Sequence, residues 1–88
     1  MAEVTLTVVH PAGLHARPAA LFVQAANQYS CEVKVLKGDK AVNAKSILGV
    51  LSLGVHCGEE ITVFTEGEDA KEAISCLEEL IKSNFEST

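Results

Sequence analysis

The 88-residue sequence has little positive charge and no long run of apolar residues. Seven lysines and arginines stand against twelve acidic residues, which gives a formal net charge of −5. Proteins that bind nucleic acid or an anionic membrane surface normally carry a basic patch, so this charge argues against both partners. No apolar segment approaches the ~18 residues of a membrane span, and Met1–Val4 lacks the basic and apolar stretches of a signal peptide. We therefore expect a cytoplasmic protein with no nucleic-acid partner and no membrane insertion.

Cysteine is also scarce. Cys31, Cys57 and Cys76 are odd in number and contain no C-x-x-C pair, which argues against a disulfide framework or a zinc site. His10 and His56, together with Cys57, offer metal binding as an alternative, but no pair among them has the spacing of metal ligands. We expect no metal site and no cofactor.

The composition indicates one small domain covering residues 1–88. Hydrophobic residues make up 48% of the chain and aromatic residues only 5%. This balance fits a modest core built from Val, Ile, Leu and Ala.

The periodicity of apolar residues predicts alternating strands and helices. Two-residue alternation predicts strands at residues 4–8, 31–37, 41–44 and 61–65. Helical spacing predicts helices from Ala16 to about Tyr29, from Ser46 to near Gly54, and over residues 70–81. The order β-α-β-β-α-β-α predicts an α+β fold, a two-layer open-faced sandwich with helices on one face of a mostly antiparallel sheet.

The last of these helices has a candidate start signal. Asp69 is followed by Glu72 three residues later, which is a variant of the capping-box spacing. We therefore expect Asp69 to cap this helix.

The most informative segment is Gly13-Leu14-His15-Ala16-Arg17-Pro18-Ala19-Ala20, which follows a strand pattern and opens a helical one. A helix N-terminus has unpaired amides and a partial positive charge, so it attracts anions. The imidazole of His15 is a nucleophile that can accept a group and release it again. The amides of Ala16 and Arg17 and the guanidinium of Arg17 can bind phosphate oxygens, while Pro18 suits the first helical turn. The run predicts a site that carries a phosphoryl group on His15.

At this run the chain resembles the HPr-like phosphocarrier proteins of the bacterial phosphoenolpyruvate-dependent sugar phosphotransferase system. A second match, Lys45–Gly54, resembles the regulatory-serine segment of that family, and the resemblance covers essentially the whole chain. It implies a four-stranded antiparallel sheet in the order 1-4-2-3, which periodicity alone does not give. It also implies that Nδ1 of His15 becomes phosphorylated, whereas the sequence itself leaves the choice of ring nitrogen open. The implied function is a phosphoryl carrier rather than an enzyme that turns over substrate.

Ser46 is a second candidate site. From the sequence alone it is a serine N-cap of the short helix. The resemblance implies that it is also a regulatory phosphoserine, modified by a dedicated serine kinase/phosphatase, with a transcription regulator as a further partner.

Ile47, Leu48 and Leu51 follow Ser46 at helical spacing. A helix this short and apolar cannot bury every side chain, so we expect an exposed apolar patch of the kind that marks partner sites. The resemblance implies that this patch docks enzyme I, the phosphoryl donor, and the sugar-specific EIIA domains that accept the group. We expect the chain to be a monomer.

Two other readings remain open. The first is a purely regulatory HPr-like module that acts through Ser46; the resemblance implies that relatives of that kind lack the active histidine, and His15 is present. The second is a small metabolic enzyme, but apart from Arg17 no second catalytic group stands near His15 in the sequence.

Overall fold

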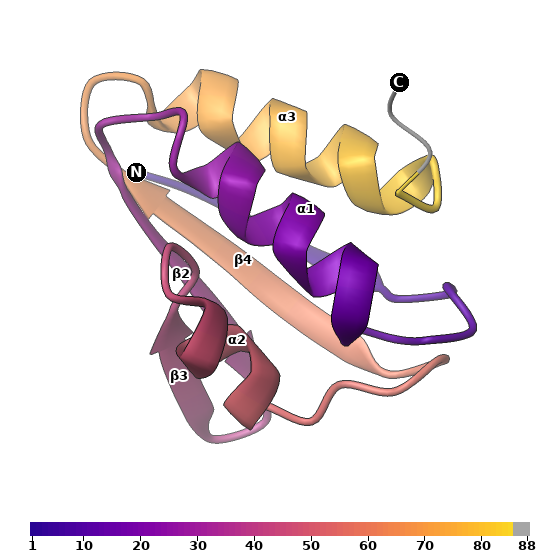
Figure 1. Ribbon diagram of the computed structural model, residues 1–88. Coiled ribbons are helices and arrows are strands. Elements are labelled where there is room, and N and C mark those ends of the chain that lie inside the picture. Colours follow the sequence, from indigo (N-terminus) through magenta and orange to yellow (C-terminus); the bar gives the residue numbers. More distant parts are fainter. Residues whose placement is uncertain (86–88) are drawn as a thin grey trace.

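The computed structural model in Figure 1 describes residues 1–85. Along the chain these residues form β1 (Ala2–Thr7), α1 (Ala16–Ala26), β2 (Glu32–Lys37), β3 (Lys40–Asn43), α2 (Ile47–Ser52), β4 (Glu60–Glu66) and α3 (Ala70–Lys82). The predicted order of elements is therefore confirmed.

The strands form one antiparallel sheet in the order β1-β4-β2-β3. In Figure 1 the helices lie on one side of this sheet, with α1 and α3 running side by side across β4 and α2 beside β3. This arrangement confirms the predicted α+β fold and the strand order that the resemblance implied.

The hydrophobic core fills the layer between the sheet and the helices. Alternate side chains of β2 and β4 point into it because successive residues of a strand face opposite sides. They meet the inner faces of α1 and α3, and the central members of the core are Val33, Val35, Ile61, Val63, Ala19, Phe22, Ala73, Leu77 and Ile81. The opposite face of the sheet includes polar residues such as Thr5 and Thr62, whose hydroxyls lie 3.0 Å apart across paired strands.

The start of α3 differs from the prediction. Asp69 is the N-cap residue, but its carboxylate makes no capping hydrogen bond. Its oxygens instead accept hydrogen bonds from the amides of Ser30 and Cys31, each at 2.9 Å. These bonds, led by that of the Ser30 amide, lower the pKa of Asp69. The predicted capping box is wrong because this carboxylate holds the turn between α1 and β2.

The first helix also ends earlier than predicted, at Ala26 instead of near Tyr29. The side-chain amide of Asn27, the C-cap residue, donates a hydrogen bond to the carbonyl oxygen of Lys45 at 3.1 Å. The ammonium of Lys45 in turn donates to the carbonyl of Tyr29 at 2.6 Å. The chain leaves the helix because these long-range bonds, with those to Asp69, fix the turn that follows.

The cysteines and the helices add two further facts. The thiols of Cys31, Cys57 and Cys76 are free. No helix within residues 1–85 is both long enough and apolar enough to cross a membrane.

Candidate functional site

His15 stands at the start of α1. It is the N-cap residue, with an extended backbone (φ −128°, ψ 163°), and its side chain makes no capping hydrogen bond. Among residues 1–85, no backbone carbonyl accepts from the amides of Ala16 and Arg17, and Pro18 has no N–H to offer. The half-buried imidazole is therefore set beside two free amides at the positive end of a helix.

Ala16 carries backbone strain next to this ring. Its φ is +51°, in the left-handed region that costs a residue with a side chain about 1–2 kcal/mol. Strained residues of this kind cluster at functional sites, where the surrounding structure holds them in place.

The position of His15 is fixed by a close contact between the loop before α1 and the loop that contains Val55. The amide of Leu14, a fully buried residue, donates to the carbonyl of Val55 at 3.0 Å. Gly13 has φ +63°, and a Cβ at this position would lie 2.2 Å from the same carbonyl oxygen. Only glycine therefore fits, and this fit fixes where the chain enters α1.

Arg17 is the only arginine in the chain. It is exposed, and it takes part in none of the ion pairs formed among residues 1–85. A guanidinium without a carboxylate partner, two residues after His15, is available for bidentate binding of a phosphate.

The structure also brings His56 to His15. The two ring centroids lie 5.6 Å apart with an interplanar angle of 51°. From the sequence, we consider His56 only with His10 and Cys57, as a metal-binding alternative. No local pattern could have found its pairing with His15, because 41 positions separate the two histidines and the loop contact at Val55 joins them.

His10 does not join this pair. Its Nδ1 accepts a hydrogen bond from the amide of Ala12 at 3.0 Å. Its ring packs edge-on against Phe85, with centroids 5.9 Å apart. These contacts give His10 a structural role in the loop before His15.

Ser46 is the N-cap of α2, as predicted. Its hydroxyl accepts a hydrogen bond from the amide of Gly49 at 3.1 Å. The neighbouring carbonyl of Lys45 is bound by Asn27, the C-cap of α1. Ser46 therefore lies near the C-terminal end of α1, whereas His15 stands at the N-terminal end of this 11-residue helix, which is about 16 Å long.

Comparison with known proteins adds evidence from outside the chain. Residues 2–83 match the family described as "PTS HPr component phosphorylation site". The chain is 43% identical over 82 residues to "Phosphocarrier protein HPr" of Treponema pallidum, which covers 93% of each chain. It is 49% identical over 77 residues to "HPr-like protein Crh" of Halalkalibacterium halodurans, which covers 88% of this chain and 92% of the relative.

The chain belongs to the HPr family of phosphocarrier proteins. Its fold agrees with this: the crystal structure of HPr-C-His from Thermoanaerobacter tengcongensis superposes with a TM-score of 0.97 at 50% identity, over 100% of this chain and 99% of that one.

Not every similar HPr structure is described as a single chain. The structure described as an HPr dimer from the same organism has a TM-score of 0.80 at 50% identity, over 99% of this chain and 100% of that one. Because this similar protein is described as a dimer, it does not fit well with the monomer that we expect from the sequence.

The apolar patch expected after Ser46 in this HPr chain is exposed. The accessible fraction is 40% for Ile47, 77% for Leu48 and 36% for Leu51, whereas Val50 on the inner side of α2 is fully buried. We call Ile47, Leu48 and Leu51 the α2 patch. It is an exposed group of large aliphatic side chains on one helix.

Two lysines hold the other end of α2. The ammonium of Lys37 donates to the carbonyl of Gly54 at 2.9 Å, and that of Lys40 donates to the carbonyl of Ser52 at 2.7 Å. Both lysines come from the β2–β3 hairpin. Their positive charges lie where the helix has its partial negative charge, so they stabilise this short helix.

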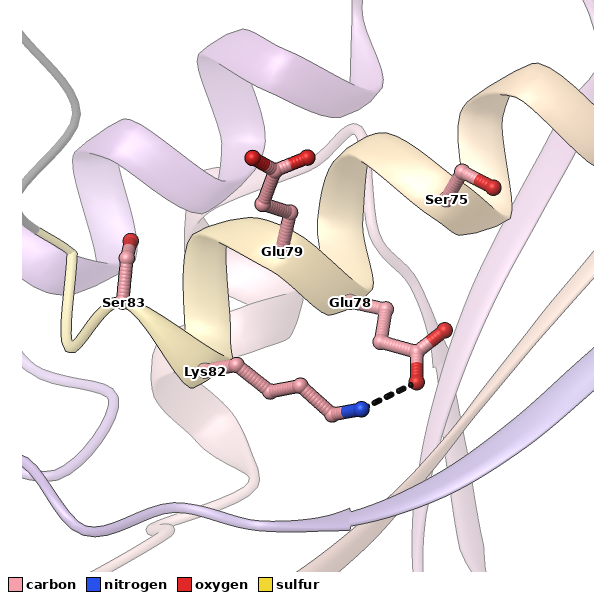
Figure 2. Close-up of a pocket in the computed structure, with 5 residues that line it drawn as sticks. All are labelled: Ser75, Glu78, Glu79, Lys82 and Ser83. Carbon is pink, nitrogen blue, oxygen red and sulfur yellow. Dashed lines mark ion pairs between the residues drawn. The ribbon is translucent and has the colours of Figure 1, made fainter.

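A shallow hollow on α3 is separate from these sites. Figure 2 shows its five lining residues, Ser75, Glu78, Glu79, Lys82 and Ser83, all from α3 and its C-terminal end. Glu78 and Lys82 form an ion pair at 2.9 Å on one side of the helix, while Glu79 and Ser83 point to the other. Because these side chains do not converge, the hollow offers no arrangement for binding a ligand.

Proposed function

We propose that this HPr-family chain accepts a phosphoryl group on His15 from enzyme I and passes it to sugar-specific EIIA domains. The observation that carries the proposal is the uncapped start of α1. An imidazole, two free amides and the only arginine of the chain meet there. In this proposal the phosphoryl group comes originally from phosphoenolpyruvate. We place the protein in the cytoplasm.

The transfer requires a nucleophilic nitrogen and groups that stabilise the charge of the phosphoryl group. The lone pair of a ring nitrogen of His15, Nδ1 in our proposal, forms a bond to phosphorus as the bond between phosphorus and the donor's leaving atom breaks. The phosphoryl group brings about two negative charges. The amides of Ala16 and Arg17, the positive end of α1 and the guanidinium of Arg17 stabilise these charges. His15 is modified at the end of the step, so the chain is a carrier and not a turnover catalyst.

The α2 patch and Ser46 supply docking and regulation in this proposal. Ser46 and His15 lie near opposite ends of α1, which is about 16 Å long, whereas the Debye length is about 8 Å at physiological ionic strength. The charge of a phosphoserine at position 46 would therefore be largely screened from His15. A modification of Ser46 by a serine kinase/phosphatase would therefore act through the partner that covers the α2 patch. A transcription regulator that reads phosphoserine would dock on the same surface.

The test is incubation with phosphoenolpyruvate and enzyme I, followed by detection of acid-labile phosphate on the chain. We expect one phosphoryl group per wild-type chain and none on His15→Ala. His10→Asn, which keeps an acceptor for the amide of Ala12, is the matched control and should be labelled like the wild type. Label that persists in His15→Ala would move the site to another histidine.

The same experiment separates the regulatory alternative. If the wild type takes no acid-labile phosphate from enzyme I, while an ATP-dependent kinase gives acid-stable phosphate at Ser46, the chain is a regulatory module of the HPr type. Transfer to an added EIIA domain, with loss of label from His15, completes the test of the carrier role.

A further inference from the structure

The side chain of His56 lies beside the proposed phosphoryl carrier with most of its surface free. Its accessible fraction is 74%, and its ring centroid is 5.6 Å from that of His15. Opposite charges within about 4–6 Å strongly favour each other's charged forms. A phosphoryl group bonded to the edge of the His15 ring that faces His56 would lie within the range in which it interacts with the imidazole of His56.

His56 is also held in one orientation. Oε1 of Glu59 accepts a hydrogen bond from the His56 amide at 2.7 Å and lies 3.3 Å from its Nδ1. Lys37 pairs with the same oxygen at 3.0 Å. In the neutral ring, this arrangement favours the tautomer whose proton is on Nδ1, which faces Glu59. Nε2 is then the nitrogen without a proton.

Glu59 keeps its charge at every pH at which a histidine titrates. The hydrogen bond from the His56 amide, and next the bond from Lys37, lower the pKa of Glu59 to about 2. The carboxylate can therefore orient both the neutral and the protonated ring of His56.

We propose that His56 is a second imidazole of the site, which takes up a proton and binds the phosphoryl group carried by His15, with Glu59 as its positioning residue. The proposal rests on the proposed function of His15. No covalent step at His56 is involved: one proton from water adds to Nε2, and the resulting N–H donates to a phosphoryl oxygen.

The charged and titratable groups around His56 agree with this role. The start of α1 contributes His15 and Arg17, the end of β2 contributes Lys37, and the loop of His56 itself contributes Glu59. Cys57, in the same loop, is turned away, with its thiol donating to the carbonyl of Val9 at 3.4 Å. Lys37 already pairs with Glu59. Arg17 stays positively charged throughout, so among these groups His56 is the one whose charge can change when about two negative charges arrive at His15.

The experiment uses the full chain, phosphorylated chemically with phosphoramidate so that no partner protein is needed. Nitrogen-15 NMR of the histidine rings identifies the phosphorylated nitrogen and reports the protonated fraction of each ring. At pH 7 we expect the protonated fraction of His56 to rise when His15 is phosphorylated. Identical His56 spectra in the two forms from pH 5.5 to 8.5 would overturn the proposal.

The second measurement is the equilibrium between phosphorylated enzyme I and the phosphorylated chain. At pH 6 we expect His56→Gln to shift it toward enzyme I by about two- to five-fold, the range of a partly exposed charge pair. At pH 8.5 the shift should be smaller, because imidazole groups lose their proton as the pH rises. His56→Gln keeps a polar side chain on an exposed loop, so it separates the loss of titration from a loss of folding.

Glu59→Gln tests the positioning role, and Glu60→Gln is the matched control, since it makes the same charge change on an exposed neighbouring residue. We expect Glu59→Gln to lower the protonated fraction of His56 in the phosphorylated chain, and Glu60→Gln to leave it unchanged. If both variants changed the protonated fraction of His56 equally, Glu59 would act only through its charge and not by positioning the ring.

The two proposals fail in different ways. If phosphoramidate modifies His15 and His56 responds, but enzyme I transfers nothing, the carrier function is wrong and the contact with His56 stands. If enzyme I phosphorylates His15 and His56 does not respond, the carrier function stands and the role of His56 is wrong.

Discussion

The two helices that carry the candidate sites begin in opposite ways. α2 begins at Ser46, whose hydroxyl satisfies the amide of Gly49. α1 begins at His15, whose ring caps nothing, and a strained Ala16 follows it. A capping side chain is typically worth about 1 kcal/mol, so α1 lacks a stabilising contact that the shorter α2 has. The start of α1 therefore leaves the amides of Ala16 and Arg17 without a partner among residues 1–85, whereas at the start of α2 the hydroxyl of Ser46 already accepts from one amide.

The largest effect is expected from Gly13→Ala, which removes the support of the α1 terminus. The new Cβ would overlap the carbonyl of Val55 and break the bond from the Leu14 amide. We expect a loss of at least about 3 kcal/mol in the free energy of unfolding, because backbone overlap adds to the cost of about 1–2 kcal/mol for a left-handed residue. Urea titration followed by circular dichroism gives the value.

Gly38→Ala is the matched control for this substitution. Gly38 has a similar φ of +58°, but a Cβ there would meet nothing within 4 Å. It should show only the backbone cost of about 1 kcal/mol. Equal losses for the two variants would mean that the contact with Val55 contributes nothing.

The next largest effect on stability is expected at Ser46, the N-cap of α2. Ser46→Ala removes the acceptor of the Gly49 amide and should lower the free energy of unfolding by about 1 kcal/mol. Ser46→Asp keeps an acceptor at a position where negative charge is favourable, so its stability should stay near that of the wild type. It should nevertheless slow phosphorylation of His15 by enzyme I, since the donor must desolvate a charge next to the α2 patch.

Ser75→Asp adds the same charge on α3 and should leave the transfer rate unchanged. If Ser46→Asp and Ser46→Ala are phosphorylated at equal rates, Ser46 is a structural cap without a regulatory role.

The smallest effect on stability should come from capping α1 itself. His15→Asp places a carboxylate at the open N-terminus, where it can accept from the Arg17 amide and interact with the helix dipole. We expect a gain of about 0.5–1 kcal/mol in the free energy of unfolding, together with complete loss of phosphoryl transfer. Reduced stability of this variant would show that the terminus does not favour negative charge.

Much of the fold could be predicted from the sequence because the signals were local. The alternation around Val33 and Val63 identified two central strands, and the serine before Ile47 identified the start of α2. The motif around His15 pointed to a helix N-terminus by the same local reasoning. The strand order came from the family resemblance, since periodicity says which residues face a core but not which strands are neighbours.

The features that sequence reasoning missed all depend on contacts between distant segments. The capping-box spacing of Asp69 could not show that the Ser30 and Cys31 amides would take its carboxylate. The apolar spacing of α1 could not show that bonds to Lys45 would end the helix early. His56 looked like an isolated loop residue until the contact at Val55 set it beside His15.

The lysines at the end of α2 have an entropic consequence. A helix of six residues does not persist on its own in water, yet this one is fixed by Ser46 at one end and by Lys37 and Lys40 at the other. The α2 patch is thereby held by the sheet before any partner arrives. A protein that docks on it has to order a few aliphatic side chains but no backbone, so little of the binding free energy is lost to conformational ordering.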